Sequence, residues 1–288
     1  MFHDFKALQE FSIIQDLNTL VNYYLEHKTA ISEALFIDRY RQLIGYSTEE
    51  CYNHFADWYM NFCVLPILKN ETTNSVIDSQ LLLETNFITE NLIDGCTLFD
   101  VGCGPGRIPY LFHNNPKVKK ILAFDISSTM LRKAQELKKQ LDYGGDITFF
   151  RADVVNLQRM HIEEPVVATC MFGTLGNIPR EEDRVAALKN IKQNIYNGKI
   201  LLTVFNMNAV EQAREYYQKT SASGGYGLDI VEISNSTKTK TYFVSPASKF
   251  YSTWYTKKGI KEELKKAGLK GKIDVNDELI LVTCNIKT

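Results

Sequence analysis

Hydrophobic residues recur at helical spacing through most of the first 92 positions of the chain. Ile14, Leu17 and Val21 follow one another at intervals of three or four residues, and the same pattern continues from residue 31. Such spacing gives each helix one apolar face that packs against its neighbours. The pattern therefore predicts an all-helical N-terminal region over residues 1–94.

Two local signals predict where one helix of this region begins and ends. Ser47 followed by Glu50 is a capping-box pattern, so a helix is expected to begin at Thr48. Pro66 is expected to end that helix, because proline lacks the backbone N–H and its ring clashes with the preceding turn.

From Gly95 onward, short apolar runs alternate with amphipathic helical stretches. One of these stretches carries Met130, Ala134 and Leu141 on one face. Another is predicted to begin at Pro179, whose fixed φ suits a first helical position. The alternation is typical of strand–helix–strand units that build a parallel sheet. The predicted strands are residues 97–101, 120–124, 147–151, 166–171 and 200–205.

The pattern changes again after residue 216. A turn rich in Ser and Gly leads into two short apolar segments, residues 229–233 and 240–244. Two such segments separated by a turn predict an antiparallel hairpin. We interpret this hairpin as an insertion at about residues 221–250.

The C-terminal part is predicted to complete the sheet. A helix is expected from residue 256, with Ile260 and Leu264 on its apolar face. Two strands follow, residues 271–275 and 278–284, and the short turn between them suits an antiparallel pair.

Charge and cysteine content narrow the class of partner. Thirty-three Lys and Arg residues against 34 Asp and Glu give a net charge of −1, without the basic excess that nucleic-acid binding requires. No stretch of about 18 apolar residues and no signal-like N-terminus occurs, so a cytoplasmic protein without a membrane partner is expected. The six cysteines form no Cys-x-x-Cys pair, which predicts neither structural zinc nor any other metal site.

A glycine-rich segment is the main candidate for ligand binding. Residues 99–107 read FDVGCGPGR and lie between a predicted strand and a predicted helix. Glycines permit positive φ and close approach to a ligand, and the helix start offers unpaired N–H groups. A dinucleotide fingerprint would place its third glycine at position 107, which is Arg107 here, whereas the third glycine is Gly106. The spacing therefore argues against NAD.

This segment resembles motif I of the class I S-adenosylmethionine-dependent methyltransferases, in which an acid, here Asp100, precedes three alternating glycines. The resemblance implies S-adenosyl-L-methionine as cofactor and S-adenosyl-L-homocysteine as product. It also implies an α/β, Rossmann-like domain over residues 95–288. In that fold a mostly parallel seven-stranded sheet has helices on both faces and an antiparallel last strand. An N-terminal helical extension and the inserted hairpin would complete the chain.

Three later segments extend the resemblance in the same order. Asp125 ends the second strand, where the family's carboxylate accepts hydrogen bonds from the ribose hydroxyls of the cofactor. Asp153 follows the third strand, where the family recognises the adenine amino group. Residues 170–178, CMFGTLGNI, match the region that lines the methyl-transfer site. The alternatives are a helix cap for Asp125, an ordinary loop acid for Asp153 and simple packing for Cys103.

An upstream segment, residues 52–59, reads YNHFADWY and is similar to the Tyr-Asp-x-x-Ala-x-x-Tyr element of small-molecule methyltransferases. In that element the tyrosines close over the methionine end of the cofactor, and Asn53 replaces the usual acid. With Phe55 and Phe62 the two tyrosines also form a stripe at helical spacing that could simply be core. The full set of predicted cofactor residues is Tyr52, Tyr59, Asp100, Gly102, Cys103, Gly104, Gly106, Asp125, Ile126, Met130, Asp153, Val154, Cys170, Met171 and Phe172.

The predicted activity is methyl transfer to a nitrogen or oxygen of a small-molecule metabolite. The Asp/Asn-Pro-Pro-aromatic motif of base and glutamine methyltransferases does not occur after the fourth strand, where residues 170–173 read CMFG. The sequence identifies no catalytic residue. It leaves open a non-catalytic S-adenosylmethionine sensor or partner subunit, and a peptide or protein methyltransferase. The substrate candidates are Asn177, Asn206, Tyr251 and Trp254, and residues 1–94 are expected to act as a lid.

Overall fold

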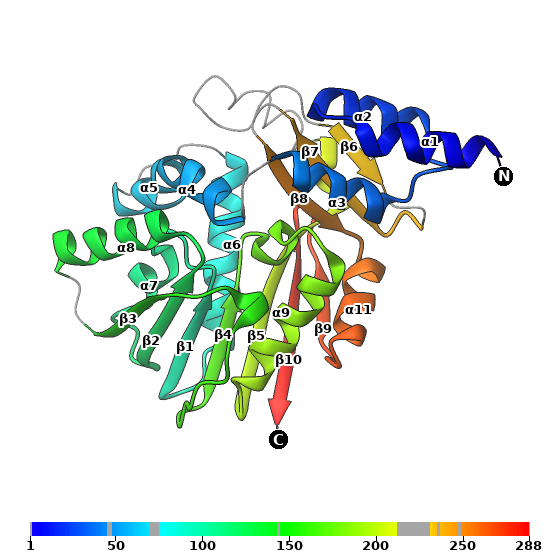
Figure 1. Cartoon of the computed structure of the whole chain (residues 1–288). Helices are drawn as coiled ribbons and strands as arrows, with labels where there is room; N and C mark the ends of the chain where they lie inside the picture. The colour runs from blue at the N-terminus through cyan, green and yellow to red at the C-terminus, as the bar shows by residue number, and fades with distance from the viewer. Residues whose placement is uncertain are drawn as a thin grey trace.

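The computed structural model describes residues 2–44, 48–69, 75–142, 145–211, 231–234, 237–246 and 249–287. Its centre is a seven-stranded sheet in the order β3-β2-β1-β4-β5-β10-β9 (Figure 1). The first five strands are parallel, and β10 is antiparallel to both β5 and β9. The predicted fold class is confirmed. The strands are β1 (Cys96–Val101), β2 (Val118–Asp125), β3 (Asp146–Arg151), β4 (Val166–Cys170), β5 (Asn197–Phe205), β9 (Lys272–Val275) and β10 (Leu279–Lys287).

Helices cover both faces of this sheet, as expected for parallel strands that are apolar along their whole length. Every residue of β1 and of β4 is buried. One apolar cluster joins one face to α6 (Ser75–Asn91), α7 (Arg107–Phe112) and α8 (Ser128–Leu141). A second cluster joins the other face to α9 (Glu181–Gln193) and α11 (Lys257–Lys266). None of the helices within the described ranges has the length and apolar character needed to cross a membrane.

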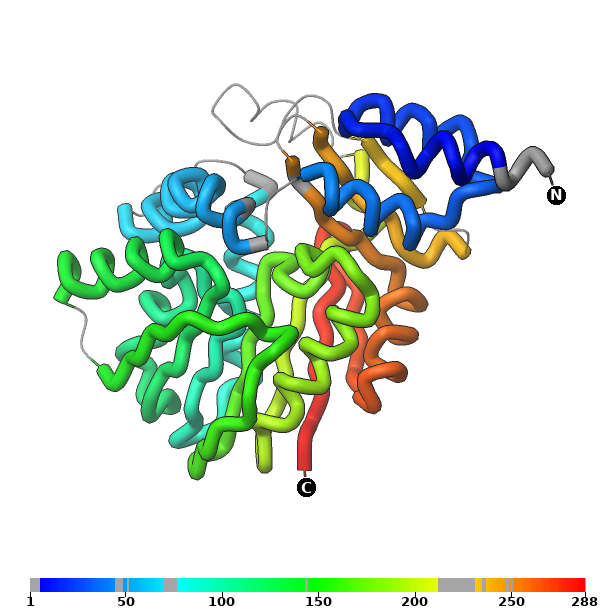
Figure 2. Tube along the Cα trace, in the orientation of Figure 1, coloured from blue at the N-terminus to red at the C-terminus, as the bar shows by residue number. Residues whose placement is uncertain are grey.

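The first three helices pack on a second, smaller sheet and not on the central one (Figures 1 and 2). Buried side chains such as Phe36 and Tyr40 share one cluster with Ile233 and Val244 of that sheet. These three helices and the insertion therefore form one cap with its own apolar core. Its elements are α1 (Phe2–Ile13), α2 (Leu17–Glu26), α3 (Glu33–Ile44), β6 (Val231–Ser234), β7 (Lys240–Ser245) and β8 (Phe250–Tyr255).

The inserted sheet has one strand more than the sequence predicted. The antiparallel pairing of β6 with β7 confirms the hairpin, but β8 pairs with β7 in turn and extends the insertion to Tyr255. The prediction that the insertion ends at about residue 250 was wrong. The predicted Ser- and Gly-rich turn lies outside the described residues.

The helix predicted to end before Pro66 continues past it. Helix α4 (Thr48–Tyr59) begins where predicted, although Ser47 of the capping box lies outside the described residues. A π-helical segment, Met60–Val64, then leads into α5 (Leu65–Lys69). Pro66 is the second residue of α5 and follows this π-helical segment, where the regular α-helical hydrogen-bond pattern is already interrupted.

Two smaller predictions also need correction. Helix α9 begins at Glu181 with Arg180 as its cap, so Pro179 lies before the helix. The Pro179 carbonyl instead accepts hydrogen bonds from Arg184 and Tyr251. Leu141 is 43% exposed because α8 ends at this residue and the chain turns away at the next.

A buried ion pair joins the two helices on the second face and links them to the cap. Arg184 Nη2 of α9 lies 2.9 Å from Glu263 Oε1 of α11, and both side chains are fully buried. Lys240 Nζ of β7 lies 2.7 Å from the same carboxylate oxygen.

We predict that Arg184→Met lowers the free energy of unfolding by about 3–5 kcal/mol, because it removes one partner of a buried ion pair. Denaturant unfolding measures this loss. The double substitution Arg184→Met/Glu263→Leu should lose less, since no buried carboxylate is left behind without its guanidinium. An equal loss in both variants would contradict the expectation.

Candidate functional site

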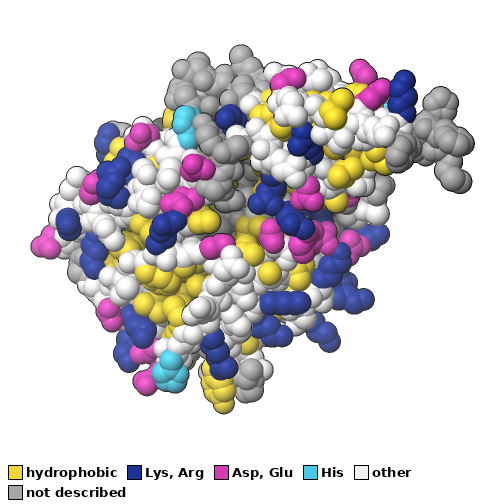
Figure 3. All heavy atoms as spheres, in the orientation of Figure 1, with side chains coloured by type: hydrophobic (Ala, Val, Ile, Leu, Met, Phe, Trp, Pro, Cys, Tyr) yellow, Lys and Arg dark blue, Asp and Glu magenta, His cyan; other side chains and the backbone are white. Residues whose placement is uncertain are grey.

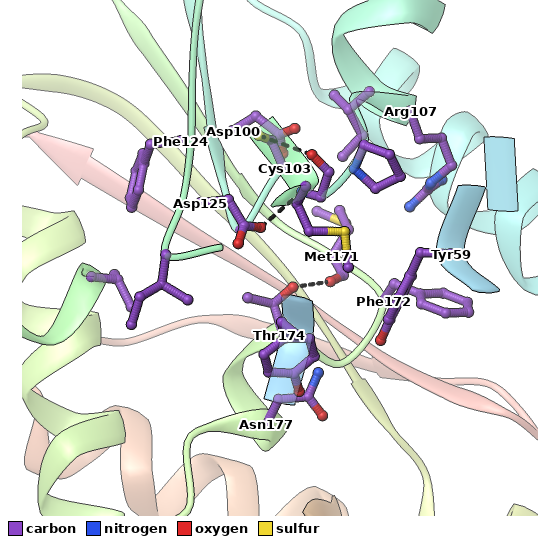
Figure 4. A pocket seen from close by; sticks show the side chains of 18 of the residues that line it. Tyr59, Asp100, Cys103, Arg107, Phe124, Asp125, Met171, Phe172, Thr174 and Asn177 are labelled. Atoms are coloured by element: carbon purple, nitrogen blue, oxygen red, sulfur yellow. Dashed lines mark hydrogen bonds between the residues drawn. The ribbon is translucent and has the colours of Figure 1, made fainter. Parts of the chain in front are cut away.

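A cavity lies at the carboxyl ends of β1, β2 and β4, where open parallel sheets bind their ligands. The space between its walls, with the open solvent at its mouth included, is about 990 Å³. Figure 4 shows its side chains converging from the sheet, from α4 and from the segment after β4. The predicted residues that line it are Tyr52, Tyr59, Asp100, Gly102, Cys103, Gly104, Asp125, Ile126, Met130, Asp153, Val154, Met171, Phe172 and Asn177.

Positions 104 and 106 of the first loop are glycine for different structural reasons. Gly102, Gly104 and Gly106 all have positive φ, at 69°, 53° and 93°. A Cβ on Gly104 would meet no atom within 4 Å, whereas a Cβ on Gly106 would lie 3.2 Å from the Cβ of Ala134 on α8. Gly106 therefore allows α7 and α8 to pack closely and does not line the cavity, while Gly104 leaves space within it.

Asp125 ties the glycine loop to the end of β2. Its Oδ2 accepts the Gly104 N–H at 2.9 Å, and its Oδ1 accepts the Ser127 N–H at 2.8 Å. Burial raises the pKa of Asp125, although these hydrogen bonds oppose the shift. Ser127, and not Asp125, caps α8, because its Oγ accepts the Met130 N–H. The helix-cap alternative for Asp125 therefore does not hold.

Asp100 is the most perturbed acid of the cavity. Its Oδ1 accepts a hydrogen bond from Thr169 Oγ1 at 2.8 Å, and its buried Oδ2 has no partner. Burial raises the pKa of Asp100 to about 7, while the Thr169 hydrogen bond and the charge of Arg107 act in the opposite direction. A cation bound beside Oδ2 would stabilise the ionised form.

Asp153 and Cys103 also keep structural contacts. The Asp153 carboxylate accepts the Val155 N–H at 2.9 Å and the Asn156 side-chain amide at 2.7 Å, so it caps the short 3-10 helix Val154–Asn156. Its position on the cavity is compatible with both interpretations made from the sequence. Burial raises the pKa of the Cys103 thiol well above its ordinary value, which fits packing rather than a nucleophile.

The aromatic stripe of α4 divides between the core and the cavity. Phe55 is 2% exposed and belongs to the core, whereas Tyr52 and Tyr59 are half-buried and line the cavity. The ring of Tyr59 meets that of Phe172 edge to face at 6.3 Å. Asn53 Oδ1 accepts hydrogen bonds from Ser127 Oγ and Thr129 N–H, so it ties α4 to the start of α8.

Of residues 1–94, the described part of the cavity wall therefore contains residues of α4 and of the π-helical segment Met60–Val64. Figure 1 places α4 over the carboxyl ends of the parallel strands. Helices α1 to α3 contribute no lining residue and instead cover the inserted sheet. Their removal would expose the core of the cap.

The sequence missed a buried ion pair beside the cavity. Arg107 Nη2 donates to Glu84 Oε2 at 2.6 Å, and Glu84 is fully buried on α6. Glu84 Oε1 also accepts the Phe172 N–H at 2.6 Å and a hydrogen bond from Thr203 Oγ1. No local motif marks Glu84. Thr174 and Ile178 line the cavity within the predicted segment 170–178. The other lining residues that were not predicted individually are Cys63, Val64, Pro105, Arg107, Ile108, Phe124 and Ala152.

Three of the four substrate candidates do not line the cavity. Asn206 is buried and donates to the Asn276 carbonyl at 2.7 Å. Tyr251 donates to the Pro179 carbonyl at 3.0 Å, and burial raises its pKa to about 12. Trp254 stacks on Phe205 with ring centroids 4.8 Å apart. Only Asn177 of this set lies at the cavity, and Cys170 is likewise buried behind it in β4.

Comparisons with known proteins agree with this geometry. Residues 98–198 match the family model of a methyltransferase domain. The CcbJ methyltransferase of Streptomyces caelestis has a similar structure, with 12% identity and a TM-score of 0.58 over 84% of this chain and 100% of that one. A S-adenosylmethionine-dependent methyltransferase of Methanosarcina mazei shows 14% identity and a TM-score of 0.52, over 70% and 98% of the chains. No curated protein sequence matches the chain.

The likeness to these structures concerns the fold, and the family match adds the methyltransferase domain. Residues 98–198 thus carry a methyltransferase domain, and the surrounding fold is similar to that of S-adenosylmethionine-dependent methyltransferases. The cavity fits S-adenosylmethionine, because it offers an unpaired buried carboxylate oxygen on Asp100 for a cation and open space at Gly104. Within the described residues no three side chains of His, Cys, Asp or Glu are grouped closely enough to hold a metal ion.

We predict that Gly104→Ala weakens S-adenosylhomocysteine binding by about tenfold or more, because the added methyl group occupies ligand space. The substitution should lower the free energy of unfolding by roughly 1–2 kcal/mol, which is the cost of placing alanine in a left-handed backbone conformation. Calorimetry and denaturant unfolding measure the two effects. Gly106→Ala is the control and should destabilise more, owing to its contact with Ala134. Unchanged binding by Gly104→Ala would contradict the assignment.

Proposed function

We propose that the protein transfers the methyl group of S-adenosylmethionine to a nitrogen or oxygen nucleophile of a small-molecule metabolite. The main support is the part of the cavity wall where Tyr59 of α4 faces the segment that follows β4. That segment contributes Phe172, Thr174, Asn177 and Ile178 to the wall. An aromatic and apolar wall with a few hydrogen-bonding groups suits a small organic acceptor.

The distribution of charge supports the same proposal. On the face shown in Figure 3, Lys and Arg side chains are interspersed with Asp and Glu side chains. The net charge of −1 offers no general attraction to a polyanion. A nucleic-acid acceptor would need a positive surface along which its phosphates could lie.

In methyl transfer the main role of the protein is to position the acceptor. S-adenosylmethionine supplies an activated methyl group on a sulfonium when bound. The wall formed by Tyr59, Phe172 and Asn177 would hold the acceptor and exclude water from the cavity. Correct placement of two reactants contributes up to about 7–11 kcal/mol to barrier reduction. No covalent intermediate on the protein is required.

The ionisable groups of the described cavity wall lie mainly on its cofactor side. Asp100 lies near the end of β1, Asp125 ends β2 and Asp153 follows β3, whereas the lining residues after β4 carry no acid or histidine. We therefore expect the acceptor to arrive with its lone pair available, or to lose its proton to solvent. Both nitrogen and oxygen acceptors stay within the proposal.

Calorimetric binding of S-adenosylhomocysteine, with NADH as control, tests the cofactor site. We expect micromolar binding of S-adenosylhomocysteine and none of NADH. Asp125→Ala should lose at least about tenfold in affinity, because the carboxylate both orders Gly104 and reaches the cavity. Thermal unfolding checks that the variant is folded. Failure of the folded wild-type chain to bind would contradict the proposal.

Transfer of a labelled methyl group then tests the acceptor class. A fraction of cell metabolites below about 1 kDa should accept the label, since the wall after β4 is aromatic and apolar with a few hydrogen-bonding groups. The matched assay uses a peptide mixture at equal mass. Labelling of peptides alone would replace the small-molecule proposal with a peptide methyltransferase.

We predict that cofactor affinity depends on pH through Asp100. Its pKa of about 7 lies above the ordinary value of 3.8, so ligand-free folded protein holds the extra proton between these two pH values. Its contribution to the free energy of unfolding therefore falls as pH rises through this window. The ammonium group of the ligand pairs with the ionised form, so S-adenosylhomocysteine affinity should rise about tenfold between about pH 6 and 8.

Calorimetry at several pH values measures this dependence. Asp100→Asn should bind more weakly and with little change over the same range, because it has no proton to lose. A flat profile in the wild-type chain would show that Asp100 does not pair with the ligand cation.

A further inference from the structure

A second charged atom beside the cavity has no hydrogen-bond partner. Arg107 lines the cavity and is 7% exposed, and its buried Nη1 is unpaired within the described structure. Buried charged groups are normally fully hydrogen-bonded, so an unpaired one at a ligand site requires a physical explanation. The unpaired Oδ2 of Asp100 lies on the same cavity wall.

The carboxylate of Glu84 fixes the orientation of the Arg107 side chain. Its Nη2 donates to Glu84 Oε2 at 2.6 Å. The other oxygen of Glu84 already accepts hydrogen bonds from the Phe172 N–H and from Thr203 Oγ1. Glu84 is thus engaged through both oxygens and does not serve Nη1. A guanidinium held in this way can bind a second carboxylate through its remaining N–H groups.

Asp100 and Arg107 together present opposite charges to one end of the cavity. Figure 4 shows both residues on the same side, with Cys103 between them. An amino-acid group carries an ammonium and a carboxylate on one carbon atom, so it has the matching arrangement of charges. The methionine end of the cofactor is such a group.

We propose that Arg107 binds the carboxylate at the methionine end of the cofactor through Nη1, and that Glu84 positions Arg107 for this contact. The inference rests on the proposed function, because it takes S-adenosylmethionine as the ligand. It also gives α6, which lies outside the matched residues 98–198, a part in cofactor recognition.

Two ligands that differ only at this end separate recognition from a structural role. S-adenosylhomocysteine and 5′-methylthioadenosine share the adenosine and the thioether, but only the first carries the amino-acid group. A residue that merely supports the fold changes the affinity for both. A residue that binds the carboxylate changes the affinity for S-adenosylhomocysteine alone.

The main variant is Arg107→Met/Glu84→Gln, which removes both charges and leaves no buried ion unpaired. Calorimetry should show S-adenosylhomocysteine affinity lowered about ten- to a hundredfold, the size of a charged hydrogen bond, with 5′-methylthioadenosine affinity within about twofold of wild type. Arg107→Lys keeps the charge without the planar fork and should retain part of the preference.

The matched control is Arg132→Met, which removes an exposed guanidinium that pairs with Glu136 on α8. The ratio of the two affinities should equal that of the wild type in this variant. Thermal unfolding shows which variants are folded. If the double variant does not fold, a lowered ratio in Arg107→Lys supports the proposal and an unchanged ratio overturns it.

Two results overturn the inference in different ways. Equal loss of both ligands in the double variant, or no loss of either, would restrict Arg107 to a structural role while leaving the cofactor assignment intact. A wild-type chain that binds neither ligand would overturn the proposed function together with this inference.

Discussion

One buried carboxylate, Glu84, constrains how four elements beside the cavity pack against one another. Taking an ionised acid out of water costs several kcal/mol unless its oxygens are fully paired. Its partners come from α7, from the segment after β4 and from β5. These three elements and α6 must therefore meet in one arrangement. This also holds Phe172 at a φ of 53°, a conformation that an aromatic residue rarely adopts.

The cap supports the segment after β4 without lining the cavity. Tyr251 of β8 donates to the carbonyl of Pro179, as does Arg184 of α9, and Pro179 follows the lining residue Ile178. Trp254 stacks on Phe205, whose ring in turn meets Phe172 at 5.7 Å. The inserted sheet therefore contacts the segment after β4, directly and through Phe205, without entering the cavity. Changes in the insertion can alter the acceptor site through these contacts even though their side chains lie outside it.

The unpaired atoms of Asp100 and Arg107 fit a site prepared for a charged ligand. Each costs free energy in the ligand-free chain, because neither finds a partner in the protein. Such local costs are common at functional sites, where the rest of the fold supplies the stability. Here the two apolar clusters on either side of the central sheet provide that support.

The sequence by itself determined the strand–helix order, the glycine loop and the positions of Asp100, Asp125 and Asp153, because these depend on local periodicity and on motifs at strand ends. It did not show the third strand of the insertion, whose neighbours in the sheet set its pairing. Nor did it show Glu84, which binds a backbone N–H 88 residues away. It placed Trp254 and Tyr251 at the substrate, whereas packing turned both into the core. Only the tertiary structure decides such contacts, because burial and pairing depend on which distant segments share a face.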